Sequence, residues 1–168
     1  MVSSPQDSPG PRGQHVDVLV VGAGFSGLYL LHRLRGAGFN VRVLDKAADI
    51  GGTWYWNRYP GARFDSESWS YSFSFAEELL QEWEWPEHFS AQPDTLRYLN
   101  YVADKFNLRR EMRFNSKVTA AQFNDDTNMW TVTTETGEQA TGQALIMRLG
   151  PSPHIHCPTF PDSSAQNC

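Results

Sequence analysis

A glycine-rich turn between two apolar segments most constrains how this chain can fold. Residues 15–21, HVDVLVV, form a continuous β-branched run, which is typical of a strand buried on both faces of a parallel sheet. Residues 22–27 read GAGFSG, and apolar residues then recur at helical spacing over 28–34. Residues 40–44, NVRVL, predict a second strand. The order of strand, glycine turn, helix and strand predicts a βαβ unit.

The turn matches the G-x-G-x-x-G pattern of dinucleotide-binding proteins. Gly22 permits the tight turn, Gly24 lets the backbone approach a pyrophosphate, and Gly27 lets the helix pack closely on the strand. Phosphates then meet the free N–H groups at the start of the helix. Asp45 ends the second strand, where an acidic residue accepts ribose hydroxyls and disfavours a 2′-phosphate. The pattern predicts bound FAD or NAD rather than NADP, and a chance glycine turn is the alternative.

Further along the chain, the sequence predicts two helices. A short acidic helix is expected over 76–85, ended by Pro86, and a longer amphipathic helix over 93–106. Gln92 and Asp94 are both candidates for capping the start of the longer helix.

The last third of the chain predicts strands. Three alternating segments are expected to form an antiparallel meander over 117–123, 129–134 and 139–143. The apolar run 144–147, ALIM, predicts a separate buried strand. The predicted fold class is therefore α/β: a Rossmann-like parallel sheet with helices plus a three-stranded antiparallel β-meander.

Composition predicts one folded domain in the cytoplasm. The chain has 168 residues, 40% hydrophobic and 13% aromatic, which is enough to bury a core. Its net charge is −5 without a basic stripe, which argues against binding nucleic acid or anionic membranes. The apolar run 16–31 is broken by Asp17 and by glycine and serine, so no membrane span is predicted. The polar start of the chain lacks the apolar core of a signal peptide.

We expect three segments along the chain. They are a disordered leader over 1–14, the Rossmann-like domain over 15–150 and an irregular Pro-rich tail over 151–168. In the tail, His154, His156 and Cys157 lack a fourth ligand and a rigid scaffold, so no metal site is predicted.

The aromatic stretch that follows the βαβ unit distinguishes FAD from NAD. Residues 49–75 mix Gly, Trp, Tyr, Arg and Pro without a clear period, and core packing is the plain interpretation of their aromatic side chains. However, GGTWYWNRYPGAR at 51–63 resembles the flavin-binding signature of the Baeyer–Villiger monooxygenases. The resemblance continues through SYSFSF at 70–75, LLQEWEW, QPDTLRYLNYVADKF and VTAAQF, and covers about residues 15–147.

The resemblance implies FAD as the cofactor and assigns contacts residue by residue. Ser26 and Asp45 match contacts to the pyrophosphate and to the adenosine ribose, and the backbone of Val118 matches a contact to the adenine. The segment 53–56 matches residues that lie along the flavin, and Tyr71 matches a further flavin contact. The implied cofactor-binding residues are Gly22, Gly24, Phe25, Ser26, Gly27, Asp45, Lys46, Gly52, Thr53, Trp54, Tyr55, Trp56, Arg63, Asp65, Tyr71 and Val118.

The resemblance also implies a catalytic candidate and a reaction. Asp65 matches an aspartate near the isoalloxazine ring, and the stretch 63–65 matches residues that touch NADP, although the family commonly has Cys where Phe64 stands. NADPH would reduce FAD, O₂ would add to the flavin, and the resulting peroxyflavin would convert a ketone to an ester or lactone.

The sequence departs from the family after residue 147. The family has Ala-Thr-Gly or Ala-Ser-Gly where this chain has Arg148-Leu149-Gly150, and a charge in place of a small packed residue is expected to cost stability. The family's NADPH domain, its linking motif F-x-G-x-x-x-H-x-x-x-W and its peroxyflavin-stabilising arginine are not found in the sequence. We therefore expect an incomplete, truncated FAD-binding domain over 15–150. A non-catalytic fragment and an NAD-binding dehydrogenase domain are the alternatives.

Overall fold

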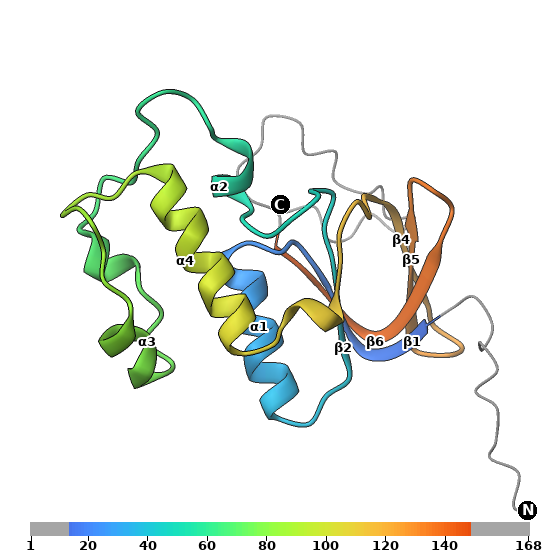
Figure 1. Cartoon of the computed structure of the whole chain (residues 1–168). Coiled ribbons are helices and arrows are strands. Elements are labelled where there is room, and N and C mark those ends of the chain that lie inside the picture. The colour runs from blue at the N-terminus through green and yellow to red at the C-terminus, as the bar shows by residue number, and fades with distance from the viewer. Residues whose placement is uncertain (1–13, 149–168) are drawn as a thin grey trace, which may run out of the picture.

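The computed structural model describes residues 14–148, which form a six-stranded sheet with helices on one face (Figure 1). The strands are β1 (Gln14–Val21), β2 (Val41–Leu44), β3 (Met112–Arg113), β4 (Val118–Asn124), β5 (Met129–Thr134) and β6 (Gln139–Met147). The α-helices are α1 (Phe25–Gly36), α2 (Thr53–Trp56), α3 (Glu77–Glu82) and α4 (Gln92–Lys105). Two 3₁₀ turns, η1 (Ser68–Tyr71) and η2 (Arg109–Glu111), lie between them.

The sheet combines a parallel and an antiparallel part. Its strand order is β3-β2-β1-β6-β5-β4. The pairs β1–β2, β1–β6 and β2–β3 are parallel, whereas β4–β5 and β5–β6 are antiparallel. The predicted fold class, a Rossmann-like parallel sheet with a three-stranded antiparallel meander, is confirmed. The predicted tail 151–168 and all of the predicted leader except Gln14 lie outside the described residues.

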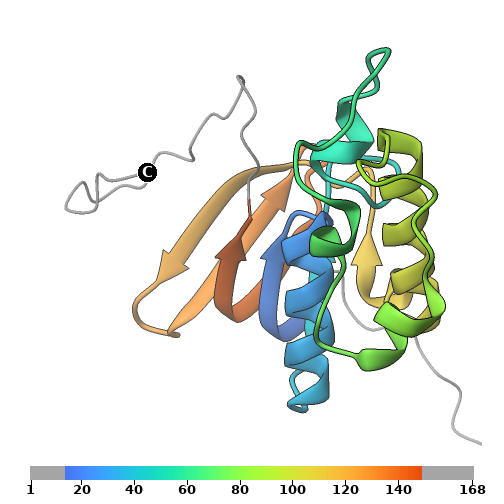
Figure 2. The ribbon, with the colours of Figure 1, turned by 90° about the vertical axis from the view of Figure 1, so that its left-hand side faces the viewer.

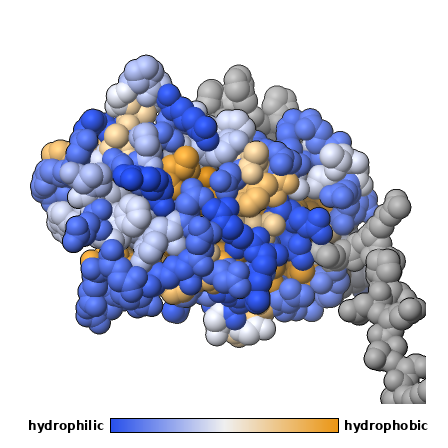
Figure 3. All heavy atoms as spheres, viewed as in Figure 1, coloured by the Kyte–Doolittle hydropathy of each residue, from blue (hydrophilic) through white to orange (hydrophobic). Residues whose placement is uncertain are grey.

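Both faces of the central strand β1 are buried, as its continuous β-branched sequence predicts. On one face, α1 and α4 pack against the parallel strands (Figure 2), and Val18, Val20, Leu28, Leu99 and Val102 share a core. On the other face, Ala121 and Val132 of the meander form a second cluster with Val16, Leu19 and Leu44 of β1 and β2. Burial of each such Val or Leu side chain contributes about 1.5–3 kcal/mol. The helical face in Figure 3 is mainly hydrophilic, with apolar residues in small separate areas.

The end of the meander differs from the prediction. Residues 139–147 form the single strand β6 rather than one strand over 139–143 and another over 144–147. β6 pairs with β1 from Ala140 to Met147, but with β5 only as far as Gly142. The prediction that 144–147 is buried is also wrong, because Ala144 is exposed and residues 145–147 are only half-buried. Beyond Gly142 the strand pairs with β1 alone, so its side chains have a neighbouring strand on one edge only.

The predicted helices are present, with α3 shorter than expected and α4 beginning and ending one residue earlier, but the predicted caps of α4 are wrong. The N-cap is Ala91, and no side chain caps the helix. Gln92 instead donates its amide N–H to the carbonyl oxygen of Trp54, and Asp94 pairs with Arg97. Pro93 in the first turn favours the helix start, because its fixed φ suits a helix and its missing N–H would have no helical partner.

Residues 14–148 contain neither a helix that could span a membrane nor a cluster of metal-binding side chains. No helix there has the length and apolar character needed to cross a bilayer. No group of three or more His, Cys, Asp or Glu side chains there is arranged to hold a metal ion. The motif at 154–157 lies outside this range.

Candidate dinucleotide-binding site

The glycine loop joins β1 to α1 through direct backbone contacts. Gly22 has φ = +111°, which favours glycine, and donates its N–H to the carbonyl of Leu44 over 2.9 Å. A Cβ placed on Gly27 would lie 1.9 Å from the carbonyl oxygen of Gly22. The first turn of α1 therefore rests on the backbone of the loop, as the sequence pattern predicts.

The loop also contacts the start of α2. Gly52 has φ = +54°, and a Cβ placed on it would lie 2.9 Å from the Cα of Gly24. Gly51 donates its N–H to the carbonyl of Ala23 over 3.1 Å. The two glycine motifs are thus joined backbone to backbone, which side chains at Gly24 or Gly52 would prevent.

Asp45 ties the glycine loop to the end of β2. Its side chain is buried, and its carboxylate accepts the N–H of Ala23 over 2.5 Å and the N–H of Ala47 over 2.7 Å. Charge-assisted hydrogen bonds of this kind are stronger than those between neutral groups. The sequence predicts a ribose contact for Asp45, whereas this contact with the loop was not anticipated.

Val118 begins β4, and the residues just before it contact the chain that follows β2. Ser116 donates its N–H to the carbonyl of Asp45, and Asn115 donates to that of Ala47, each over 2.8 Å. The chain therefore brings Val118 and Asp45, which are far apart in sequence, to one edge of the sheet.

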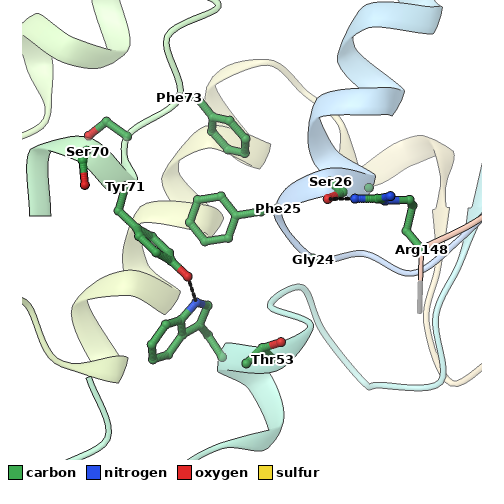
Figure 4. Close-up of a pocket in the computed structure, with 11 residues that line it drawn as sticks. Gly24, Phe25, Ser26, Thr53, Ser70, Tyr71, Phe73 and Arg148 are labelled. Carbon is green, nitrogen blue, oxygen red and sulfur yellow. Dashed lines mark hydrogen bonds between the residues drawn. The ribbon is translucent and has the colours of Figure 1, made fainter. Parts of the chain in front are cut away.

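A cavity of about 610 Å³ opens in front of the glycine loop (Figure 4). Three segments and one residue after β6 form its wall: Gly24, Phe25, Ser26, Gly27, Thr53, Trp54, Ser70, Tyr71, Ser72, Phe73 and Arg148. Seven of the predicted cofactor-binding residues are in this wall: Gly24, Phe25, Ser26, Gly27, Thr53, Trp54 and Tyr71. The cavity thus collects residues from the glycine loop, from α2 and from the SYSFSF segment.

Aromatic rings form one side of the cavity. The indole N–H of Trp54 donates to the hydroxyl of Tyr71 over 3.2 Å, and Phe25 meets Tyr71 edge to face at 4.9 Å between ring centroids. Behind them the buried Phe64 stacks on Tyr71, with ring centroids 4.3 Å apart. These contacts fix the orientation of the rings and give the cavity a rigid apolar wall.

A second layer of hydrogen bonds supports this wall from α4 and from Trp85. The backbone N–H of Phe73 donates to the hydroxyl of Tyr98 over 2.7 Å, and the indole N–H of Trp85 donates to the hydroxyl of Ser72 over 2.9 Å. Burial raises the pKa of Tyr98 to about 12, so this hydroxyl stays protonated at neutral pH.

Substituting Tyr98→Phe should lower the free energy of unfolding by about 1–2 kcal/mol, because the N–H of Phe73 loses its buried acceptor. Urea unfolding at neutral pH measures this change. Tyr101→Phe, on the same helix with its hydroxyl on an exposed Glu82 carboxylate, is the matched control and should change stability less. A drop in Tyr98→Phe no larger than in the control would contradict the proposed support.

The raised pKa of Tyr98 adds a pH dependence. Between pH 10 and about 12 the unfolded chain loses this proton while the folded chain keeps it, so stability falls as pH rises. In Tyr98→Phe, the free energy of unfolding should lack this part of the decrease between pH 10 and about 12.

Nine predicted residues are not in the cavity wall. Gly22 begins the loop and donates its N–H to Leu44, Asp45 accepts the N–H of Ala23, Val118 begins β4, and Gly52 contacts Gly24. Tyr55 accepts the N–H of Ala48 over 3.3 Å. Trp56 is 54% exposed, with the ammonium of Lys46 5.2 Å from its ring centroid, which is a cation–π contact outside the cavity.

Arg63 and Asp65 also lie outside the wall. Arg63 is held by the carboxylate of Glu87 at 3.0 Å and by the carbonyl of Phe89 at 2.8 Å. Asp65, the predicted catalytic residue, is exposed. Its neighbour Phe64 nevertheless stacks on Tyr71 of the cavity wall.

Arg148 lines the cavity although the sequence analysis did not assign it a binding role. Its side chain is exposed and reaches the first turn of α1, where a guanidinium N–H donates to the hydroxyl of Ser26 over 2.9 Å. The expected cost of packing a charge into a small space is therefore wrong, because the side chain extends into an open cavity. The sequence shows that a charged residue follows the last strand, but not that it contacts Ser26.

Comparisons with known proteins agree with this geometry. Residues 20–82 match the model of the family described as NAD(P)-binding Rossmann-like domain. The chain is 49% identical over 135 residues to acetone monooxygenase (methyl acetate-forming) of Gordonia sp. (strain TY-5), covering 80% of this chain and 25% of that protein. It is 46% identical over 149 residues to a Baeyer–Villiger monooxygenase of Pseudooceanicola batsensis, covering 88% and 27%.

Solved structures give the same result. An oxidised steroid monooxygenase bound to NADP matches with a TM-score of 0.82 and 48% identity, over 88% of this chain and 28% of that one. The OTEMO complex with FAD and NADP matches with a TM-score of 0.77 and 41% identity, over 84% and 28%. The chain spans about a quarter of the length of the curated relatives it matches.

Proposed function

From its homology to Baeyer–Villiger monooxygenases, which confirms the resemblance in the sequence, we propose that this chain is the FAD-binding part of a flavin-dependent monooxygenase. The observation that carries the proposal is the cavity in which the glycine loop, α2 and the segment 70–73 meet. These are the segments that the family resemblance assigns to the cofactor. In the related OTEMO structure, FAD and NADP are bound.

The residues around the cavity fit the diphosphate and the isoalloxazine of FAD. No side chain caps the start of α1, so its first N–H groups and the hydroxyl of Ser26 are available to a diphosphate. Gly24 in the cavity wall has no side chain to keep a ligand from its backbone, and a Cβ there would lie 3.3 Å from the Cα of Gly52. The rings of Trp54 and Tyr71, which meet edge to face at 5.9 Å between centroids, offer an apolar surface for the isoalloxazine.

FAD, when bound, supplies the reaction with NADPH and O₂ that oxygenates a small-molecule ketone to an ester or lactone. The residues of this chain bind and orient the cofactor. Asp45 would accept the ribose hydroxyls with the lone pairs that the backbone leaves free, and the backbone of Val118 would lie at the adenine. The aromatic wall would exclude water from one face of the ring. We keep Asp65 as the catalytic candidate, because its neighbour Phe64 stacks on the wall. We also propose a cytoplasmic location, as the composition predicts.

Titration of the purified chain with FAD, followed by flavin fluorescence, tests this proposal. We expect saturable binding of FAD and much weaker binding of NAD⁺. In Gly24→Ala, a Cβ would lie 3.3 Å from the Cα of Gly52 and would press the start of α2 away from the glycine loop, so FAD should bind at least about tenfold more weakly.

Gly36→Ala is the matched control, because the new Cβ at the other end of α1 meets no atom within 4 Å. It should bind FAD as the parent does. A chain that binds NAD⁺ better than FAD would favour the dehydrogenase alternative. A folded chain that binds neither would favour a non-catalytic fragment.

A further inference from the structure

Arg148 lies where the last parallel strand meets the glycine loop. Its backbone N–H donates to the carbonyl of Val21 over 2.9 Å, which continues the pairing of β6 with β1. Its own carbonyl lies over the loop, since a Cβ on Gly22 would come within 2.6 Å of that oxygen. The residue is therefore fixed by its backbone at the entrance to α1, and its side chain starts beside the cavity.

Among the cavity-wall residues that the structure describes, only Arg148 carries a formal charge. The other ten lining residues are glycine, aromatic or hydroxyl residues. Among residues 14–148, no ion pair involves Arg148. A cavity with one guanidinium and no carboxylate favours an anionic ligand.

The local field adds to this preference. The guanidinium sits at the first turn of α1, where the helix dipole is positive and no acidic side chain is present. Two positive groups side by side are unfavourable unless an anion lies between them or next to both. The positive charge at the first turn of α1 is therefore not balanced by a side chain there, and a bound phosphate group would balance it.

We propose that Arg148 is a diphosphate-binding residue of the cavity, held at Ser26 so that its remaining N–H groups face the ligand. Ser26 accepts one N–H from the guanidinium (Figure 4), which leaves further donors of its planar fork. That fork can bind two phosphate oxygens at once. This inference rests on the proposed function for the site, but it concerns the diphosphate and not the flavin ring.

Calorimetric titrations with ADP and with FAD, at low and at moderate salt, test the inference. ADP presents a diphosphate without a flavin. We expect Arg148→Ala to bind both ligands about tenfold more weakly than the parent at low salt, and to show a smaller loss of affinity when salt is added. Arg148→Lys should recover part of the affinity, because it restores the charge without the fork. Arg110→Ala removes an exposed arginine elsewhere and should match the parent.

The outcomes separate this inference from the proposed function. If Arg148→Ala binds ADP and FAD as tightly as the parent, or more tightly, the inference is overturned while FAD binding stands. If the parent binds ADP through Arg148 but does not bind FAD, the inference stands and the flavin proposal fails. A parent chain that binds neither ligand overturns both. Circular dichroism of each variant confirms that the fold is retained.

Discussion

The Gly27→Ala variant is expected to lose about 3 kcal/mol or more of its free energy of unfolding. The added Cβ would lie 1.9 Å from the carbonyl oxygen of Gly22 and 2.9 Å from its carbonyl carbon. Both are backbone atoms, so no flexible side chain can move away. The N–H of Gly22 is hydrogen-bonded to Leu44, which holds the loop against β2. Relief of the clash must shift α1 away from the sheet and open the core that Leu28 and Leu31 share with β1.

Urea unfolding followed by circular dichroism measures this loss, and Gly36→Ala is again the control. That variant adds the same methyl group to the same helix in open space, and it should be neutral or stabilising by up to about 1 kcal/mol. Equal unfolding midpoints for Gly27→Ala and the parent would show that the loop tolerates a side chain. The inference that α1 packs too closely on the loop to admit a Cβ at Gly27 would then be wrong.

Local pattern was sufficient to predict the βαβ unit and the helices. Strand and helix periodicities differ over 15–44, and glycines at 22, 24 and 27 mark the turn between them. The resemblance matched the glycine loop, the TWYW segment and Tyr71 separately, and the structure brings residues of all three to one cavity.

What the sequence could not predict depends on contacts between distant residues. The sequence predicted two strands where the structure has the single strand β6. This strand pairs with β1 from Ala140 to Met147 but with β5 only as far as Gly142. Pairing with two strands at once has no signature in the alternation of apolar and polar residues. Gln92 was assigned to a helix cap because short-range rules favour it there, but it binds the carbonyl of Trp54 38 positions away. Arg148 reaches Ser26 across 122 positions, so its place in the cavity wall appears only in the folded chain.

Asp45→Asn is expected to lower both the stability of the chain and its affinity for FAD. The carboxylate of Asp45 accepts two backbone N–H groups, from Ala23 in the glycine loop and from Ala47 after β2. An asparagine side chain has one oxygen, so it can accept only one of these donors while its amide N–H₂ faces the other. We expect a loss of about 2 kcal/mol in the free energy of unfolding, since a buried charge-assisted hydrogen bond is replaced by two opposed donors.

The loss of FAD affinity follows from the same geometry. Ala23 precedes Gly24, so a loop that is released from Asp45 no longer holds its N–H groups in place for the diphosphate, and the ribose loses its acidic acceptor as well. We expect FAD to bind about tenfold more weakly. Asp17→Asn is the matched control, because Asp17 accepts a backbone N–H from Asn40 over the same 2.7 Å at an exposed position, where the loss should be small.

Stability without ligand separates the two roles of Asp45. The hydrogen bonds from Ala23 and Ala47 to Asp45 stabilise the ligand-free chain, whereas a ribose contact acts only when the cofactor is bound. Urea unfolding without FAD should therefore already show the loss in Asp45→Asn. A variant with the parent's stability and weakened FAD binding would reduce Asp45 to a ribose ligand. A variant with lower stability and the parent's FAD affinity would show that Asp45 only holds the glycine loop. Since one carboxylate lies both at the loop and at the predicted ribose position, we expect both measurements to change together.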